Sequence, residues 1–577
     1  MADHPLVDES GSASTARAGR ANWIVRRLYT SNPFYVISAE LVFIGLRVSF
    51  PRNEGMFETW ALTLGLGAYT LLLAITACLL IRLGRVWDDV RSILLLVVLM
   101  FLAMSVTFDD TLASQPRFGV ACALGGFLFA AGVSEGVLRA IRLALPALFR
   151  VPYYLILGLF FLYPAVLVPL LDQPESAALQ WALFGFSPVA GLAFLALLPA
   201  IRRGPAYVTE NGSPWRWPLY PWVLFGLLAF AVCVRANYLC ISMHFIERSA
   251  VDDSRSSSIF GLYFLVPFLY AICVVLLELA LKTRNRSFVR LVLAFPLGLV
   301  VLCLVDPPAN VVAQRFHSLL MRDLGGSPFF LSLLAALGFY GYAALRRISI
   351  AGDFLSVALS ALAFVAPGSL GLDDLSNLRL WPLVALGGLQ IAMGGRKSES
   401  WRSALGAQSL IIAAGGALPA GYSDTERGLV IAHLGLGATL VFGVAYQDLW
   451  GVIARRLGAL LLFLGCVLAV IDVSAIIPSI SPEARCAYAI FAIAIALGYG
   501  TLMRDRVYHV AVAASAATWM VMMGWRSYVL LRQFIVGLDL ITWGFVSFLL
   551  AALISFRKAG GWHKRYSRRV SDRDLLG

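Results

Sequence analysis

The sequence predicts an all-α fold: a polytopic integral membrane helical bundle of about 18 transmembrane helices, with both termini cytoplasmic. Three observations support this prediction: composition, long apolar runs and an asymmetric distribution of basic residues. Of the 577 residues, 60% are hydrophobic and 14% are charged, and the mean hydropathy is +0.80. A soluble protein has about half apolar and a quarter charged residues. The charged residues are too few to solvate several soluble domains, so we expect lipid to surround the chain.

The apolar runs are the elements of the predicted bundle. They lack the strict alternation of barrel strands and are longer than such strands, which favours helices. The eighteen runs lie at 34–50, 57–81, 92–108, 118–138, 151–171, 178–201, 218–241, 259–281, 288–305, 327–344, 350–366, 378–394, 401–419, 428–446, 457–478, 484–503, 507–524 and 534–556.

Basic residues alternate between the loops that join these runs. With the N-terminus inside, the inside segments hold 33 Lys and Arg residues and the outside segments hold 11. Positively charged residues are retained on the cytoplasmic side of a membrane. The net charge of +13 therefore indicates orientation, and it does not indicate a nucleic-acid partner.

The remaining segments are short. Residues 1–33 are expected to form a disordered cytoplasmic tail with a short interfacial helix, 34–556 the bundle, and 557–577 a basic cytoplasmic tail. The inside loops and the basic tail are expected to contact anionic lipids. The longest outside connection, 306–326, has one apolar helical face, which predicts an interfacial helix that divides the runs nine and nine. The oligomeric state stays open.

Ionisable residues inside apolar runs are candidates for function because burying a charge in hydrocarbon is costly. Arg235 is the deepest cation, and Asp472 and Asp539 match its predicted depth. Such a pair would line a substrate or proton path, or would be a structural ion pair. His433 is either a core histidine or a proton relay. The other members of the set are Glu40, Arg47, Glu135, Glu278 and Asp353, of which the four acids lie near the inner face.

Three predicted outside loops contain two consecutive aspartates. Carboxylate oxygens suit hard cations, so these loops are candidates for binding a metal or a metal-diphosphate group. The alternative is that each pair caps the following helix. The candidates are Asp109, Asp110, Asp252, Asp253, Asp373 and Asp374.

Motif searches favour no enzyme class. The sequence has no P-loop, no dinucleotide-binding GxGxxG after a strand, no HExxH and no GxSxG. The eight cysteines form no CxxC or Cys/His cluster. We therefore predict no catalytic residues and no cofactor.

Many predicted spans, short loops and buried charges favour transporter-like movement of a small or lipid-like solute. The alternatives are a non-catalytic structural or sensory membrane component, and a membrane-embedded enzyme that acts on a lipid-linked substrate through the Asp-Asp loops. The arginine bias and abundant alanine and glycine are typical of GC-rich bacterial genomes. We expect a multi-pass protein of a bacterial inner or plasma membrane.

Overall fold

The structure is a computed structural model of the 577-residue chain. It describes residues 34–49, 56–171, 176–244, 260–304, 311–368, 379–419, 421–471, 481–535 and 537–558.

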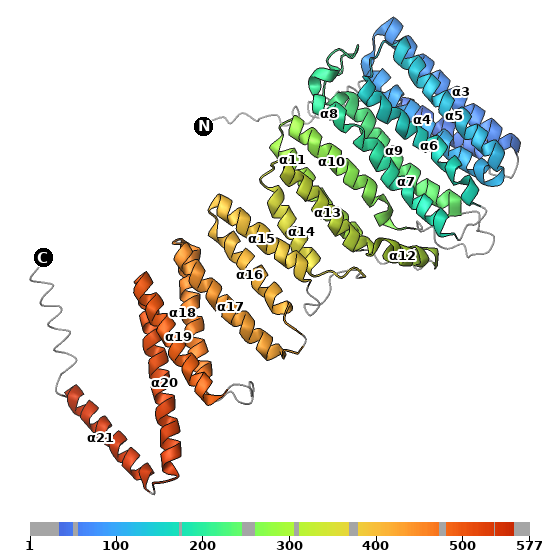
Figure 1. The fold of residues 1–577 in the computed structure, drawn as a ribbon. Helices are drawn as coiled ribbons and strands as arrows, with labels where there is room; N and C mark the ends of the chain where they lie inside the picture. The colour runs from blue at the N-terminus through green and yellow to red at the C-terminus, as the bar shows by residue number, and fades with distance from the viewer. Residues whose placement is uncertain are drawn as a thin grey trace, which may run out of the picture. The chain divides into compact units, whose positions relative to one another are not determined.

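All regular secondary structure in these residues is helical (Figure 1), and each predicted apolar run overlaps a helix. The α-helices of the first part are α2 (Phe34–Ser49), α3 (Met56–Leu79), α4 (Trp87–Ser114), α5 (Pro116–Ala140), α6 (Ala147–Leu167), α7 (Ala177–Leu195), α8 (Leu198–Arg203), α9 (Leu219–His244), α10 (Val266–Lys282), α11 (Arg286–Leu302), α12 (Val311–Leu324), α13 (Pro328–Leu345) and α14 (Ala351–Ala363). Those of the second part are α15 (Leu380–Lys397), α16 (Ser400–Gly416), α17 (Asp424–Ala445), α18 (Leu449–Val470), α19 (Pro482–Met503), α20 (Arg506–Arg532) and α21 (Leu538–Lys558).

Among the described residues, 13 helices are long and apolar enough to cross a membrane. A span needs about 20 mostly apolar residues. Helix α12 occupies the connection for which the sequence predicts an interfacial helix. It is amphipathic: Phe316 and Leu320 are buried, whereas Arg315 and Arg322 are exposed. The chain is therefore a multi-pass membrane protein built from helices.

The chain divides into two compact units, Met1–Pro382 and Leu383–Gly577. In unit 1, α4 packs against α3, α5, α6 and α9, and α10 packs against α7, α11 and α13. A continuous apolar core fills the space between these helices, with Phe101, Phe160 and Phe186 fully buried.

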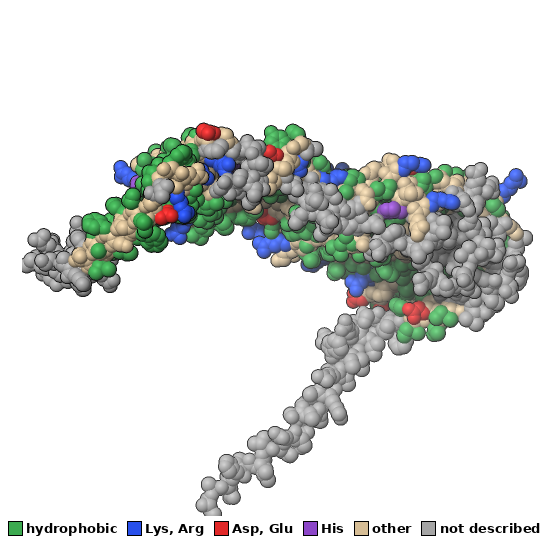
Figure 2. Space-filling model, turned by 90° about the horizontal axis from the view of Figure 1, so that it is seen from below, with side chains coloured by type: hydrophobic (Ala, Val, Ile, Leu, Met, Phe, Trp, Pro, Cys, Tyr) green, Lys and Arg blue, Asp and Glu red, His purple; other side chains and the backbone are tan. Residues whose placement is uncertain are grey.

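Unit 2 has a smaller core. Helix α18 packs against α17, α19 and α20, and Tyr508 is fully buried among them. Large apolar side chains elsewhere in the unit are exposed, such as Val441 (67%) and Phe491 (64%). Figure 2 shows hydrophobic side chains over much of the described surface. A surface of this composition suits lipid as the surrounding solvent.

Six of the described turns between neighbouring helices share one backbone conformation. Among the described non-glycine residues, those with positive φ all follow the end of a helix, with φ between 52° and 60°. They are Arg85, Arg142, Arg284, Arg347, Ser398 and Arg504. After all of them except Arg85, the next N–H donates to the carbonyl five residues earlier. This is the Schellman arrangement, which usually has glycine at the left-handed position.

Helices α3, α5, α8, α10 and α13 finish at one common end of unit 1, which we call the basic end. Three contacts join these helix ends and the turns beside them: Arg82 with Ala140, Ala144 with Asn211, and Glu278 with Arg346. Helix α8 also packs against α10. The left-handed arginines of unit 1 therefore lie at the same end of the bundle.

Candidate functional site

Arg235 of α9 forms a buried ion pair with Asp109 of α4. The Nη1 atom lies 2.6 Å from Oδ2 and the Nη2 atom lies 2.7 Å from Oδ1. Both side chains are 0% exposed. A bidentate guanidinium–carboxylate pair is among the strongest hydrogen-bonded arrangements in proteins. Because neither side chain is accessible, this pair does not line an open path in the structure.

The third guanidinium nitrogen of Arg235 forms a hydrogen bond with helix α6. Its Nε atom donates to the carbonyl oxygen of Phe160 at 3.2 Å. Pro164 lies four residues later inside the same helix and has no N–H to donate to that carbonyl. Arg235 therefore supplies the hydrogen bond that the proline removes. The ion pair and the proline together join α4, α6 and α9.

Asp109 is not one of the two acids, Asp472 and Asp539, that the sequence predicts as partners of Arg235. Asp539 instead accepts a hydrogen bond from Tyr528 and pairs with Arg532 at 3.0 Å. Asp472 lies outside the described residues. The sequence predicts that Asp109 lies in an outer loop. This prediction is wrong, because α4 extends through Asp109 to Ser114. The extra turn of helix brings this aspartate into the bundle.

One of the three double aspartates, Asp109-Asp110, lies in the described residues. Asp110 belongs to α4, while Asp252, Asp253, Asp373 and Asp374 lie outside the described residues. Within the described part of the chain, no three His, Cys, Asp or Glu residues come together in a group that could hold a metal ion.

The predicted inner-face acids have different surroundings. Glu278 is 1% exposed; it accepts a hydrogen bond from Tyr342 and pairs with Arg346, whose Nε lies 2.9 Å from Oε1. Glu135 accepts a hydrogen bond from Tyr154 at 2.7 Å and lies 3.7 Å from Arg139 and from Arg150. Glu40 is exposed on α2, Asp353 lies in the first turn of α14, and Arg47 lies in α2.

His433 lies in a groove of unit 2 between α17, α18 and α19. Its Nε2 atom is 3.0 Å from the Tyr488 hydroxyl, and its Nδ1 atom is 2.6 Å from the Leu429 carbonyl oxygen. The groove encloses about 650 Å³ and also has Arg485 in its wall. Apolar side chains from all three helices and the small residues Gly428 and Gly465 form most of the lining.

The polar residues of this groove come from two helices, and α18 contributes the apolar floor. Arg485 lies in the first turn of α19, and Tyr488 follows it by one turn. His433 lies near the middle of α17. The groove therefore has a cation near the start of α19, a hydrogen-bonded pair farther along and apolar walls between them. His433 is a candidate from the sequence alone, whereas Arg485 and Tyr488 are not. Their three-residue spacing gains meaning only because α19 places Tyr488 beside His433 of α17.

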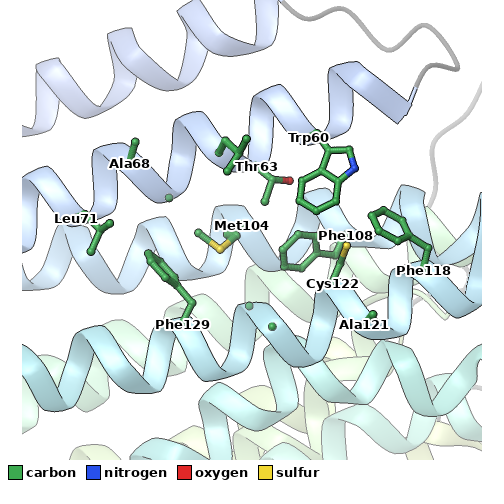
Figure 3. Close-up of a pocket in the computed structure, with 14 residues that line it drawn as sticks. Trp60, Thr63, Ala68, Leu71, Met104, Phe108, Phe118, Ala121, Cys122 and Phe129 are labelled. Atoms are coloured by element: carbon green, nitrogen blue, oxygen red, sulfur yellow. The ribbon is translucent and has the colours of Figure 1, made fainter.

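A second cavity, of about 490 Å³, lies between α3, α4 and α5 of unit 1 (Figure 3). Trp60, Met104, Phe108, Phe118 and Phe129 surround it, and small residues of α3 and α5 leave the space. Its lining is almost entirely apolar and offers no charged group to orient a ligand.

Comparisons with known proteins give no relative from which a role can be transferred. No protein-family model, curated protein or solved structure matches this chain.

Proposed function

We propose that this multi-pass membrane protein moves a lipid-like solute, and that the groove of unit 2 binds it. The observation that carries the proposal is the combination of an apolar groove of about 650 Å³ with His433, Tyr488 and Arg485 in its wall. Ligand sites are usually concave and mostly apolar, with a few polar groups that fix orientation. An amphiphile with an apolar chain and an anionic or hydrogen-bonding head matches this lining.

The buried charges of unit 1 have a different role in this proposal. Arg235 and Asp109 satisfy each other and hold three helices together, so they are assigned to the framework. Asp109 is thereby engaged by a cation, which weakens the alternative of a metal-dependent enzyme. The alternative of a non-catalytic structural component gains support from the same buried pair.

A lipid-movement assay tests the proposal. Purified protein is reconstituted into vesicles that carry a fluorescent phospholipid, and movement between leaflets is followed by chemical quenching of the outer leaflet. We expect wild-type protein to accelerate this movement. Loss of the hydrogen bond in His433→Ala, or in Tyr488→Phe, should slow it by about fivefold to tenfold, the equivalent of one hydrogen bond.

His509→Ala provides the matched control. His509 is also exposed on a helix of unit 2, but it lies in the first turn of α20 and outside the lining of the groove. This variant should move lipid at the wild-type rate. Equal rates in empty and protein-containing vesicles would contradict the transport proposal. If a photoactivatable fatty acid still labels α17 or α19 in that case, the sensory alternative replaces it.

A further inference from the structure

We propose that the basic end of unit 1 contains a specific binding site for the phosphate headgroup of an anionic phospholipid, formed where α8, α10 and α13 converge. The site is independent of the unit 2 groove. Its cations are Arg202 and Arg203 at the end of α8, Lys282 at the end of α10 and Arg346 after the end of α13.

Packing brings these cations together from three separate helices. Gly204 follows Arg203 with φ of +80°, and a Cβ atom at this glycine would lie 3.5 Å from the Lys282 Nζ atom. The lysine side chain thus lies across the turn that ends α8. The Arg202 guanidinium lies near enough to the Tyr342 hydroxyl of α13 to interact with it electrostatically. Each helix therefore contributes to one cluster, which a count of loop charges does not predict.

The cluster carries excess positive charge. Glu278 is a carboxylate within the cluster, and this side chain is already paired with Arg346. Arg203 lies over the ring of Tyr207, with its Cζ atom 4.9 Å from the centroid. Arg202, Arg203 and Lys282 are exposed. Three cations thus remain to bind an anion. The ion pair between buried Glu278 and the partly exposed Arg346 side chain holds α10 and α13 in position.

The neighbouring surface favours a phospholipid as the source of the phosphate. Leu345 immediately precedes Arg346 and is 83% exposed, and Leu192 on the preceding part of the α7–α8 span is 66% exposed. A phospholipid whose phosphate binds to the cluster would therefore have an apolar helix surface beside it, against which its acyl chains can pack. A soluble phosphate would use the cations alone.

Native mass spectrometry of the full chain in detergent tests the site, with phosphatidylglycerol and phosphatidylcholine as probes. We expect wild-type protein to bind phosphatidylglycerol preferentially. Because each cation near an anionic headgroup contributes about 1 kcal/mol, Arg202→Gln combined with Lys282→Gln should weaken this preference by about 30-fold. The charge-preserving pair Arg202→Lys with Lys282→Arg should retain most of it.

The control pair is Arg85→Gln with Arg142→Gln. It removes the same charge from exposed positions at the same end of unit 1 but outside the cluster. Equal losses in the two double variants would overturn the site in favour of general attraction to the surface. Complete displacement of the lipid by millimolar inorganic phosphate would also overturn it, because the cluster would then bind the free anion. Circular dichroism of each variant confirms that its helices are retained.

Discussion

Arg235 and Asp109 are 126 residues apart in the sequence and form a bidentate ion pair with no exposed surface. The pair connects α9 to α4, and the Arg235 Nε atom connects both to α6. Removing either partner would leave the other charge buried without compensation. Replacing both by apolar residues avoids that cost.

The first prediction concerns this pair. Asp109→Leu or Arg235→Met alone should lower the free energy of unfolding by about 3–5 kcal/mol, whereas the double variant should lower it by clearly less. Reversible denaturant unfolding in mixed micelles measures the three values. Arg322→Met is the control, because Arg322 forms an exposed pair with Asp323 and should change stability little. Additive losses in the double variant would contradict the role of the pair.

The second prediction concerns Pro164. In the Arg235→Met background, the Phe160 carbonyl loses its donor, and an unsatisfied buried carbonyl costs about 1–3 kcal/mol. Pro164→Ala restores a helical N–H and should therefore raise stability in that background. In the wild-type background, where Arg235 already donates to the carbonyl, the same substitution should bring less gain. The same unfolding experiment measures the difference, and equal effects in the two backgrounds would exclude the coupling.

The positions of the helices were predictable from the sequence, but the pairing of their charges was not. A long apolar run favours a helix in an apolar environment whatever its neighbours are, so runs such as 118–138 lie within helices such as α5. The partner of Arg235 depends instead on where α4 ends. The sequence ends this run at residue 108, because two aspartates follow, whereas the helix continues to Ser114. A buried cation from a distant helix makes that extension favourable.

The third prediction compares two adjacent glycines of α5. A Cβ atom at Gly126 would lie 2.5 Å from the Phe108 ring and 2.9 Å from the Phe161 ring, whereas a Cβ atom at Gly125 would have no neighbour within 4 Å. Gly126→Ala should destabilise unit 1 by about 1–3 kcal/mol through overpacking. Gly125→Ala should be neutral or slightly stabilising, because alanine favours helix. Thermal unfolding followed by intrinsic fluorescence separates them, and equal midpoints would contradict the close contact.

The fourth prediction concerns the left-handed arginines. A non-glycine residue in this conformation costs about 1–2 kcal/mol, part of which glycine recovers. Arg284→Gly should therefore raise the unfolding midpoint, and Arg284→Val should lower it because a β-branched side chain tolerates positive φ poorly. Lys282→Gly in the helical last turn is the control and should be destabilising. A lower midpoint for Arg284→Gly would show that the arginine side chain contributes more than the backbone strain costs.

The fifth prediction concerns pH. Hydrogen bonds from the Ser400 side chain and the Gly451 N–H hold the pKa of Asp448, the N-cap of α18, below its ordinary value of 3.8. Its stabilisation is therefore complete above that value and is lost as the pH falls through the lower folded-state pKa. Asp448→Asn should lower the unfolding midpoint at neutral pH, and the difference from wild type should shrink in acid. A difference that is independent of pH would contradict this account, and Ser400→Ala should reproduce part of it.

The recurring left-handed residue also bears on how the chain is made. A residue held at positive φ ends its helix locally, and the N–H that follows closes the turn without any contact from a distant segment. The chain reversal in a helical hairpin is thus determined by local residues. Such hairpins are α3–α4, α5–α6, α10–α11, α13–α14 and α19–α20. Once the second helix of such a hairpin has been synthesised, all the residues that form the turn have already left the ribosome. The two helices of a hairpin can therefore insert into the membrane together.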